Sequence, residues 1–348
     1  MRAEVRSPLI FIHGIKGAKL SDANGSTLWL NGVQALGLHT PDLTLPAQWK
    51  DGVQPTDGVT STGVLEFVTV IPLLFERSIY GPWLRSLETF DRPVDVFHYD
   101  WRRDNHESLA KFESFIESVK KKNGASQVQV VAHSMGGLIA LAALNRGPEN
   151  FRGVVFVGVP FAGGIGFLPD LHLGSDNGLN SRILSWEVLG TFPSTYTLFP
   201  GMSSALTDES GIVLPMDFFR ADDWEKMKFG FFAEGRTAPP GWKIFLQGAL
   251  DKAKAFREFL KPQSLAYPPI RVVIGKHLPT LALAKRGGPK AKVGWDFESL
   301  EKAPGDGRVR ETSALPPDGI PYELQISEME HADLLNDPKV VEKIRALP

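Results

Sequence analysis

The stretch from Val128 to Asn145 constrains the fold more than any other part of this 348-residue chain. Val128 to Val131 is a short continuous apolar run, typical of a buried strand, and Met135 to Asn145 is rich in Ala and Leu, which favours a helix. Between them lies Ala132-His133-Ser134-Met135-Gly136, in which a small residue stands two positions before and two positions after the serine. A sharp strand-to-helix turn brings those two positions together, and large side chains there would clash. The pattern therefore predicts a tight turn that displays the Ser134 hydroxyl at the end of a buried strand.

Strands and helices alternate on both sides of this turn. We expect strands at 8–12, 64–71, 94–99, 154–159, 270–274 and 322–326, and helices at 83–90, 107–122 and 338–347. The last helix has Asp337 as its N-cap and Pro338 at its first position. Residues 21–62 are rich in Gly, Asp, Pro and Asn, and are expected to form a long irregular connection. Repeated alternation of this kind predicts an α/β fold, with a mostly parallel sheet and helices on both faces.

From residue 161 to residue 269 the alternation stops, and the chain becomes rich in Phe, Trp, Pro and Gly. We interpret this stretch as a large lid or cap inserted over the sheet. The predicted organisation is therefore an N-terminal part of the core with the serine at 1–160, the insertion at 161–269, and a C-terminal part of the core at 270–348.

The composition excludes several classes of function. The chain has no cysteine, and therefore no disulfide, thiolate nucleophile or Cys-based metal site. Its net charge of −2 argues against nucleic-acid binding, and the lysines at 120–122 suit the end of a helix. Gly164-Ile165-Gly166 lacks the third glycine of a dinucleotide loop, and no phosphate loop or His-Glu metal motif occurs. We expect neither a cofactor nor a metal.

The hydropathy pattern bears on location. Leu9 to Ile12 is too short an apolar run for the core of a signal peptide, and no later stretch approaches the length of a membrane span. We therefore expect a soluble, cytoplasmic protein, although an export signal removed beforehand would leave no trace in this sequence. The sequence predicts no oligomeric state.

Several motifs together resemble the lecithin:cholesterol acyltransferase family of α/β-hydrolases, in order and in spacing. They are His13-Gly14-Ile15-Lys16-Gly17, Tyr99-Asp100-Trp101-Arg102, Ala132-His133-Ser134-Met135-Gly136-Gly137, Gly158-Val159-Pro160-Phe161-Ala162-Gly163-Gly164, Pro193-Ser194, Leu198-Phe199-Pro200, Gly305-Asp306-Gly307-Arg308-Val309 and His331. The departures are Ala132 in place of the more frequent Gly, Arg308 where the family usually has Thr, and the absence of the cysteines found in its secreted members. The resemblance implies an α/β-hydrolase fold with a serine nucleophile.

Ser134 needs a base and an acid, because an alkoxide is not available at neutral pH. In this fold the chain order is serine, acid, histidine. Among the eight histidines, His331 alone follows the last predicted strand on a loop before the terminal helix, and it is the predicted base. Asp306 is the predicted acid, because its flanking glycines allow a close approach to the imidazole. Asp296 is the alternative acid and lacks that glycine setting.

The other groups near these turns have narrower expected roles. The backbone N–H groups of Met135 and Ile15 are the predicted oxyanion donors. His133 is expected to point away from Ser134 and to be packed, and His13 to shape its loop rather than transfer protons. We expect Asp100 and its partner Arg102 to pin loops near the site.

Two groups in the second half of the chain remain open to two interpretations each. The aromatic residues of the insertion form either its own small core or an apolar wall for an acyl chain. The basic cluster is either a solvated loop or a contact for an anionic headgroup. The aromatic residues are Trp186, Phe192, Tyr196, Phe199, Trp224, Phe229, Phe231, Phe232 and Trp242, and the basic ones are Lys285, Arg286, Lys290 and Lys292.

These residues predict ester hydrolysis by an acyl-enzyme route. The resemblance implies lipid ester substrates, such as phospholipids or acylglycerols. Acyl transfer to an alcohol, a short-chain non-lipid esterase, and a non-catalytic protein that binds a ligand in the same fold are the alternatives. The expected partners are a small-molecule or lipid ester and, transiently, a membrane surface.

Overall fold

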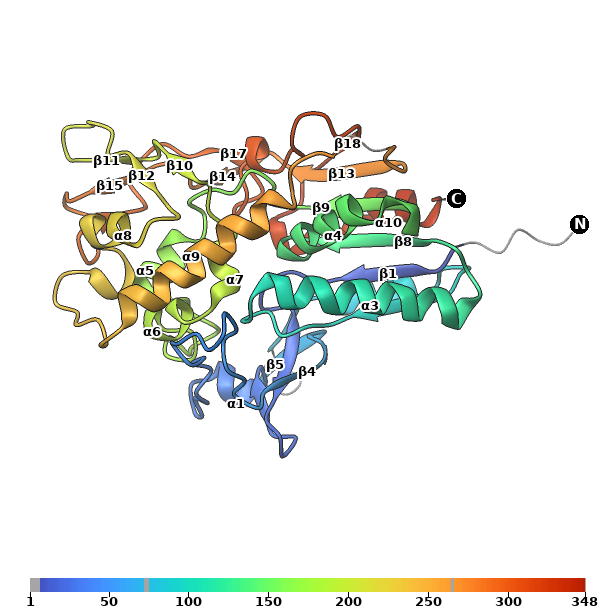
Figure 1. Cartoon of the computed structure of the whole chain (residues 1–348), viewed down its shortest axis with the longest axis horizontal. Helices are drawn as coiled ribbons and strands as arrows, with labels where there is room; N and C mark the ends of the chain where they lie inside the picture. The colour runs from blue at the N-terminus through green and yellow to red at the C-terminus, as the bar shows by residue number, and fades with distance from the viewer. Residues whose placement is uncertain (1–6, 72–74, 264–265, 348) are drawn as a thin grey trace, which may run out of the picture.

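A six-stranded parallel sheet lies at the centre of the computed structural model, which describes residues 7–71, 75–263 and 266–347 (Figure 1). Its strand order is β18-β13-β9-β8-β1-β7, and every neighbouring pair in it is parallel. The strands are β1 (Leu9–Ile12), β7 (Val94–Phe97), β8 (Val128–His133), β9 (Phe151–Val157), β13 (Ile270–Gly275) and β18 (Glu323–Ser327). The predicted α/β architecture is thus confirmed.

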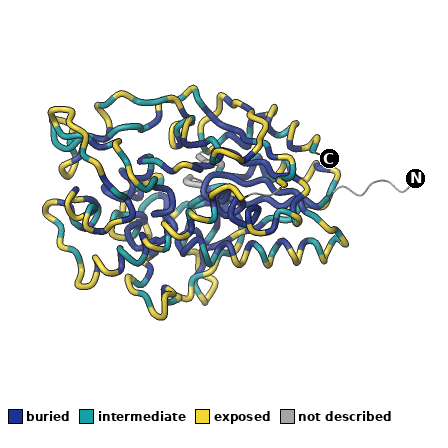
Figure 2. The backbone as a smooth tube through the Cα atoms, turned by 45° about the horizontal axis from the view of Figure 1, so that its top comes forward, coloured by how far each residue is buried: buried dark blue, intermediate teal, exposed yellow. Residues whose placement is uncertain are grey.

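Helices cover both faces of this sheet, because successive strand residues point to opposite sides. Ile10 and Ile12 pack in one buried cluster with residues of α3 (Asn105–Asn123) and α4 (Met135–Arg146). Leu9 and Phe11 pack in a second cluster with residues of α2 (Gly81–Leu87) and α10 (Pro338–Arg345). In Figure 2 the buried segments accordingly gather in the interior, and the exposed segments lie at the periphery.

Local capping explains where two of these helices begin and end. The Asp337 side chain accepts a hydrogen bond from the Lys339 N–H at 2.9 Å at the start of α10, as the sequence predicts. α3 ends at Asn123 and is capped by Gly124, which adopts a left-handed conformation with φ of 61°. The lysine run lies in the last turn of α3, where Lys122 pairs with Asp95 at 2.6 Å.

Residues 21–62 are more ordered than the sequence suggests. β2 (Ala18–Ser21), β3 (Thr27–Trp29) and β4 (Thr60–Val64) form an antiparallel sheet, and α1 (Gly32–Ala35) follows β3. The single strand expected at 64–71 is divided into β4 and β5 (Phe67–Ile71), and β5 pairs with β6 (Phe75–Ser78). β2 and β4 pair although about forty positions separate them in the sequence. A local sequence pattern contains no information on such a pairing.

The segments between β9 and β13 gather beyond the end of the sheet at which β1 terminates (Figure 1). β11 pairs in parallel with β15, so residues that follow β13 also join this layer. Its helices are α5 (Leu168–Leu173), α6 (Trp186–Gly190), α7 (Pro193–Tyr196), α8 (Ala221–Met227) and α9 (Trp242–Glu258), and its strands are β10 (Met202–Ser203), β11 (Leu206–Thr207), β12 (Met216–Asp217), β14 (Leu278–Thr280), β15 (Ala284–Arg286), β16 (Trp295–Asp296) and β17 (Ala303–Gly305). Short 3-10 helices lie at Pro148–Asn150, Gly230–Phe232, Glu311–Ser313 and His331–Asn336.

None of the helices in the described ranges combines the length and the apolar character that a membrane span needs.

Candidate active site

Ser134 occupies a strained turn between β8 and α4. Its backbone has φ of 53° and ψ of −129°, a region that L-residues rarely adopt, and its N–H donates to the Val157 carbonyl at 2.9 Å. A Cβ on Gly136 would lie 2.2 Å from the His13 oxygen, and one on Gly137 would lie 2.1 Å from a Val159 methyl carbon. The glycines after the serine are therefore needed for close packing of the turn.

The structure brings Ser134, His331 and Asp306 together, although 197 and 25 positions separate the two contacting pairs. His331 Nε2 lies 3.0 Å from Ser134 Oγ, and His331 Nδ1 lies 2.8 Å from Asp306 Oδ2. Both distances allow hydrogen bonds. This is the mutual geometry of a nucleophile, a base and an orienting acid.

Asp306 is held as a carboxylate inside the protein. Its Oδ1 accepts hydrogen bonds from the backbone N–H groups of Arg308 at 2.9 Å and Val309 at 2.7 Å. Burial opposes ionisation, but the charge of His331, its hydrogen bond and these two donors outweigh burial and hold the pKa of Asp306 below its ordinary value. A negative charge is thus maintained beside His331 Nδ1.

Ile15 and Met135 lie at this site as well. Both backbone N–H groups lack a hydrogen-bond acceptor within the described part of the chain, and Met135 occupies the first position of α4. The loop of Ile15 passes close to the nucleophile, because a Cβ on Gly14 would lie 3.3 Å from Ser134 Oγ. Two backbone donors are therefore available near the Ser134 hydroxyl.

His133 is packed, with 5% of its surface exposed, but it does not point away from the site. Its ring centroid lies 4.9 Å from that of His331, and its Nδ1 lies 2.6 Å from the Tyr80 hydroxyl. Tyr80 also accepts a hydrogen bond from the Gly14 N–H at 3.0 Å. Sequence reasoning missed Tyr80, because no motif marks it and 53 positions separate it from His133.

A large cavity of about 950 Å³ opens over Ser134 and His331. Its walls come from loops at the carboxyl ends of the central strands and from the insertion, which contributes Phe167 and Leu198. The apolar lining residues include Ile15, Leu30, Leu65, Val68, Ile79, Phe167, Leu198, Leu278 and Leu281. The position agrees with the general rule that α/β sheets bind ligands beyond the carboxyl ends of their strands.

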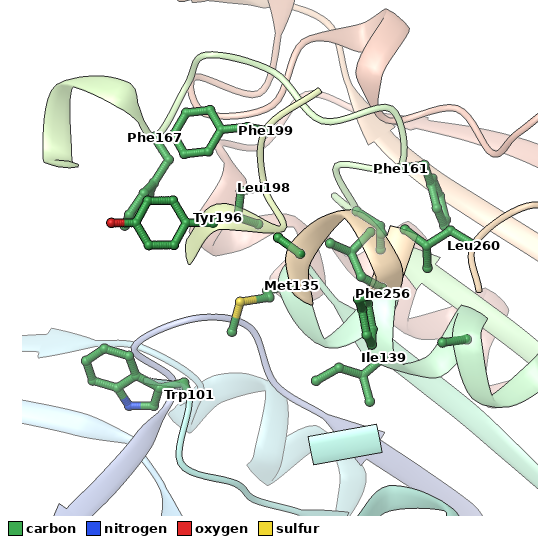
Figure 3. Close-up of a cluster of buried hydrophobic side chains, with 14 of the residues drawn as sticks. Trp101, Met135, Ile139, Phe161, Phe167, Tyr196, Leu198, Phe199, Phe256 and Leu260 are labelled. Atoms are coloured by element: carbon green, nitrogen blue, oxygen red, sulfur yellow. The ribbon is translucent and has the colours of Figure 1, made fainter. Parts of the chain in front are cut away.

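The nine aromatic residues singled out in the insertion do not line this cavity. Most of them pack with one another; the ring centroids of Tyr196 and Phe199, for example, lie 5.6 and 5.5 Å from that of Trp224. Tyr196 and Phe199 also belong to the buried cluster around Met135 that Figure 3 shows. Of the two interpretations, the core of the insertion itself is the one that the structure supports.

The other acidic residues considered from the sequence lie apart from Ser134, His331 and Asp306. Asp296 accepts hydrogen bonds from the backbone N–H groups of Glu298 and Ser299 and makes none to His331. Asp100 and Arg102 are buried and paired at 2.7 Å, and Arg102 also donates to the Leu43 carbonyl at 3.0 Å, so they pin loops as expected.

The basic residues 290 and 292 line a smaller cavity of about 220 Å³ together with Arg308. Two of the three cations are paired there, Arg308 with Asp170 at 2.8 Å and Lys292 with Glu298 at 2.6 Å. The pairing leaves little uncompensated positive charge for an anionic headgroup.

Two of the comparisons with known proteins name the lecithin:cholesterol acyltransferase family. The family model described as lecithin:cholesterol acyltransferase matches residues 78–223, which include Ser134 but neither Asp306 nor His331. The chain is 32% identical to lecithin-cholesterol acyltransferase-like 4 of Arabidopsis thaliana over 97 residues, which are 26% of this chain and 17% of that protein. It is 22% identical over 409 aligned positions to an uncharacterized protein of Saccharomyces cerevisiae, covering 98% of this chain and 61% of the yeast protein. The chain thus spans less than two thirds of the length of either relative.

A solved structure shares the fold over the whole chain. The crystal structure of the Tle4–Tli4 complex contains a chain that matches with a TM-score of 0.64 and 16% identity, covering 97% of both chains. At this identity the match establishes the arrangement of the secondary structure and nothing about the substrate.

Proposed function

Because the chain is a lecithin:cholesterol acyltransferase-like α/β-hydrolase, we propose that it cleaves carboxylic esters of lipids through an acyl-enzyme on Ser134. The observation that carries the proposal is the hydrogen-bonded series from Ser134 through His331 to Asp306 at the floor of the 950 Å³ cavity.

The chemistry follows from the positions of the atoms. Ser134 Oγ attacks the ester carbonyl carbon as His331 Nε2 takes its proton, and Asp306 stabilises the imidazolium through Nδ1–H. The N–H groups of Met135 and Ile15 bind the oxygen that becomes negative. The intermediate then expels the alcohol, which takes the proton from His331. Water, activated by His331 in the same way, releases the acid and restores Ser134.

The cavity supports a lipid substrate. Its volume of about 950 Å³ lies at the upper end of the usual range for ligand pockets, and its walls are mostly apolar. Each methylene that moves from water into such a wall stabilises the complex by about 0.8 kcal/mol. A long acyl chain therefore gains more from this cavity than acetate does.

Exposed apolar side chains near the cavity support contact with a lipid surface. Val33 is 52% exposed, Leu38 is 76% exposed and Leu179 is 77% exposed. Leu179 is held next to α1 because its N–H donates to the Ala35 carbonyl at 2.8 Å, and Ala35 lines the cavity. Apolar side chains that face water beside a binding site favour a membrane or partner contact there. The proposal therefore includes a transient contact of Val33, Leu38 and Leu179 with a membrane surface.

The test is a series of p-nitrophenyl esters from acetate to decanoate, followed by phospholipid and acylglycerol substrates, with Ser134→Ala as the control. We expect kcat/KM to rise with acyl length until the cavity is filled, and Ser134→Ala to abolish turnover. A small fluorophosphonate should label Ser134 alone. A preference for acetate over octanoate would refute the lipid substrate, and the protein would then be a serine esterase for short-chain esters.

Product analysis separates hydrolysis from acyl transfer, which the family match also supports. With a long-chain alcohol present, a hydrolase releases free acid, whereas a transferase yields the new ester. Labelling of Ser134 without turnover of any ester would instead favour a protein that binds its ligand without catalysis.

A further inference from the structure

Gly14, directly before the predicted oxyanion donor Ile15, is held from both sides by buried side chains. Its N–H donates to the Tyr80 hydroxyl at 3.0 Å, and its carbonyl oxygen lies 2.7 Å from His13 Nδ1. The Tyr99 N–H lies 3.3 Å from His13 Nε2, which therefore accepts, so that Nδ1 carries the hydrogen and donates to the Gly14 oxygen. The Gly14 carbonyl and the Ile15 N–H belong to one planar trans peptide, so fixing the carbonyl fixes the direction of the N–H.

Tyr80 connects this peptide to the catalytic histidine through His133. The Tyr80 hydroxyl lies 2.6 Å from His133 Nδ1, and His133 Nε2 lies 3.0 Å from the His331 carbonyl oxygen. A carbonyl oxygen can only accept, so His133 Nε2 carries the hydrogen and Nδ1 accepts from Tyr80. The Gly14 N–H thus donates to the Tyr80 hydroxyl, and the Tyr80 hydroxyl donates to His133 Nδ1. His133 Nε2 in turn donates to the His331 carbonyl oxygen.

The His331 loop is also anchored on its other side. The His331 N–H donates to the Asp306 carbonyl at 2.9 Å, while His133 binds the His331 carbonyl. The backbone on each side of the base is thus fixed by a separate hydrogen bond. Tyr80 and His133 are 5% exposed each, and hydrogen bonds in such a largely buried setting are stronger than in water.

We propose that Tyr80 and His133 are positioning residues, which hold the oxyanion loop at Gly14 in register with the His331 loop on either side of Ser134. This inference rests on the proposed function, because it assigns a role in the same reaction. Neither residue transfers a proton to the substrate. Their effect is on the relative placement of the oxyanion donor, the nucleophile and the base, where an error of about 1 Å can cost about a hundredfold in rate.

The experiment measures how fast a small fluorophosphonate modifies Ser134, with the intact mass of the folded protein as readout. This rate depends on the nucleophile, the base and the oxyanion donors, and requires no knowledge of the natural ester. We expect Tyr80→Phe to slow labelling about tenfold to a hundredfold. With an ester substrate, kcat should fall by the same factor while KM stays near its original value.

Tyr196→Phe is the matched control, because it also removes one buried tyrosine hydroxyl. That hydroxyl donates to the Gly190 carbonyl at 2.8 Å, and Tyr196 does not line the cavity. Both variants should lose a similar amount of thermal stability, and only Tyr80→Phe should lose labelling rate. If both variants are labelled as fast as the wild-type protein, the proposal is overturned.

A second variant tests the link itself. A glutamine at position 133 can still donate to the His331 carbonyl but offers no acceptor at the position of Nδ1, so His133→Gln breaks the same link as Tyr80→Phe. The double variant should then label no more slowly than the slower single variant. Multiplied effects would show that the residues act independently and would overturn the proposal.

Spectroscopy of the unmodified protein tests the hydrogen positions. With ¹⁵N-labelled histidine, we expect a neutral His133 protonated at Nε2, and a change of its Nδ1 signal in Tyr80→Phe. Protonation at Nδ1 instead would overturn the proposal whatever the activity. If the wild-type protein is not labelled at Ser134, the proposed function is refuted. If wild type and Tyr80→Phe are labelled at the same rate, only the positioning role is refuted.

Discussion

Removal of the buried His133 imidazole should make folding of this protein less sensitive to acid. Burial, followed by the charge of nearby His331, lowers the pKa of His133 from 6.5 to about 3. In the unfolded chain the same imidazole has its ordinary pKa of about 6.5. Between these values the unfolded state binds a proton that the folded state does not bind. The contribution of His133 to stability is therefore fully present above pH 6.5 and is lost as the pH falls below it.

The size of the effect follows from these two pKa values. Each pH unit between them changes the free energy of unfolding by about 1.4 kcal/mol. From pH 7.5 to pH 5 the folded state should lose about 2 kcal/mol through His133. That loss is a large part of the 5–15 kcal/mol by which a typical domain is stable.

The assay is urea denaturation of wild type and His133→Gln at pH 7.5, 6 and 5 at constant ionic strength. Other buried histidines act in the same direction, because burial also lowers the pKa of His13 to about 3 and that of His172 to about 4. Their contribution cancels when the variant is subtracted from the wild type. The difference in unfolding free energy should therefore change by about 2 kcal/mol between pH 7.5 and pH 5. Parallel pH profiles would show that His133 is protonated equally in both states and would refute the reasoning.

Three further predictions concern the acid, the turn at Ser134 and the insertion. Asp306→Asn should fold normally and lower kcat by roughly three to four orders of magnitude, because the carboxylate that orients His331 is lost. Asp296→Asn should leave kcat unchanged. The reverse pattern in steady-state kinetics would show that Asp296 is the acid. Gly137→Ala should destabilise the protein by about 1–3 kcal/mol in urea, since its Cβ would lie 2.1 Å from a valine methyl carbon, while Gly164→Ala, with its nearest neighbour at 3.6 Å, should have a much smaller effect. Trp224→Ala should cost about 3–5 kcal/mol as a buried ring of the insertion core, and unchanged stability in the same assay would contradict that placement.

Local sequence was enough for the features that depend on neighbouring residues. The turn at Ser134 follows from an apolar run, two small residues and a helix-forming run, and each of these lies within a few positions of the serine. The N-cap at Asp337 follows in the same way from Asp-Pro before an amphipathic stretch, and the structure has both. Chain order in the α/β-hydrolase fold then pointed to His331 as the base, and the glycines beside Asp306 distinguished this residue from Asp296 as the acid.

Pairings between distant segments were beyond the reach of sequence alone. The strands at β2 and β4 are joined across about forty residues, so the intervening stretch looked irregular from its composition. The aromatic residues of the insertion have no steady period, and only their contacts distinguish a core from a cavity wall. Phe167 and Leu198, which do line the cavity, carry no distinguishing pattern.

The orientation of the polar groups around the site was decided by tertiary structure. The sequence places His133 next to Ser134, but its ring direction depends on Tyr80 and on the His331 carbonyl, which are 53 and 198 positions away. A hydrogen bond needs a donor and an acceptor at a defined distance and angle, and only the folded backbone sets these. The sequence thus identified the candidate catalytic residues, and the packing of distant loops determined how their donors and acceptors meet.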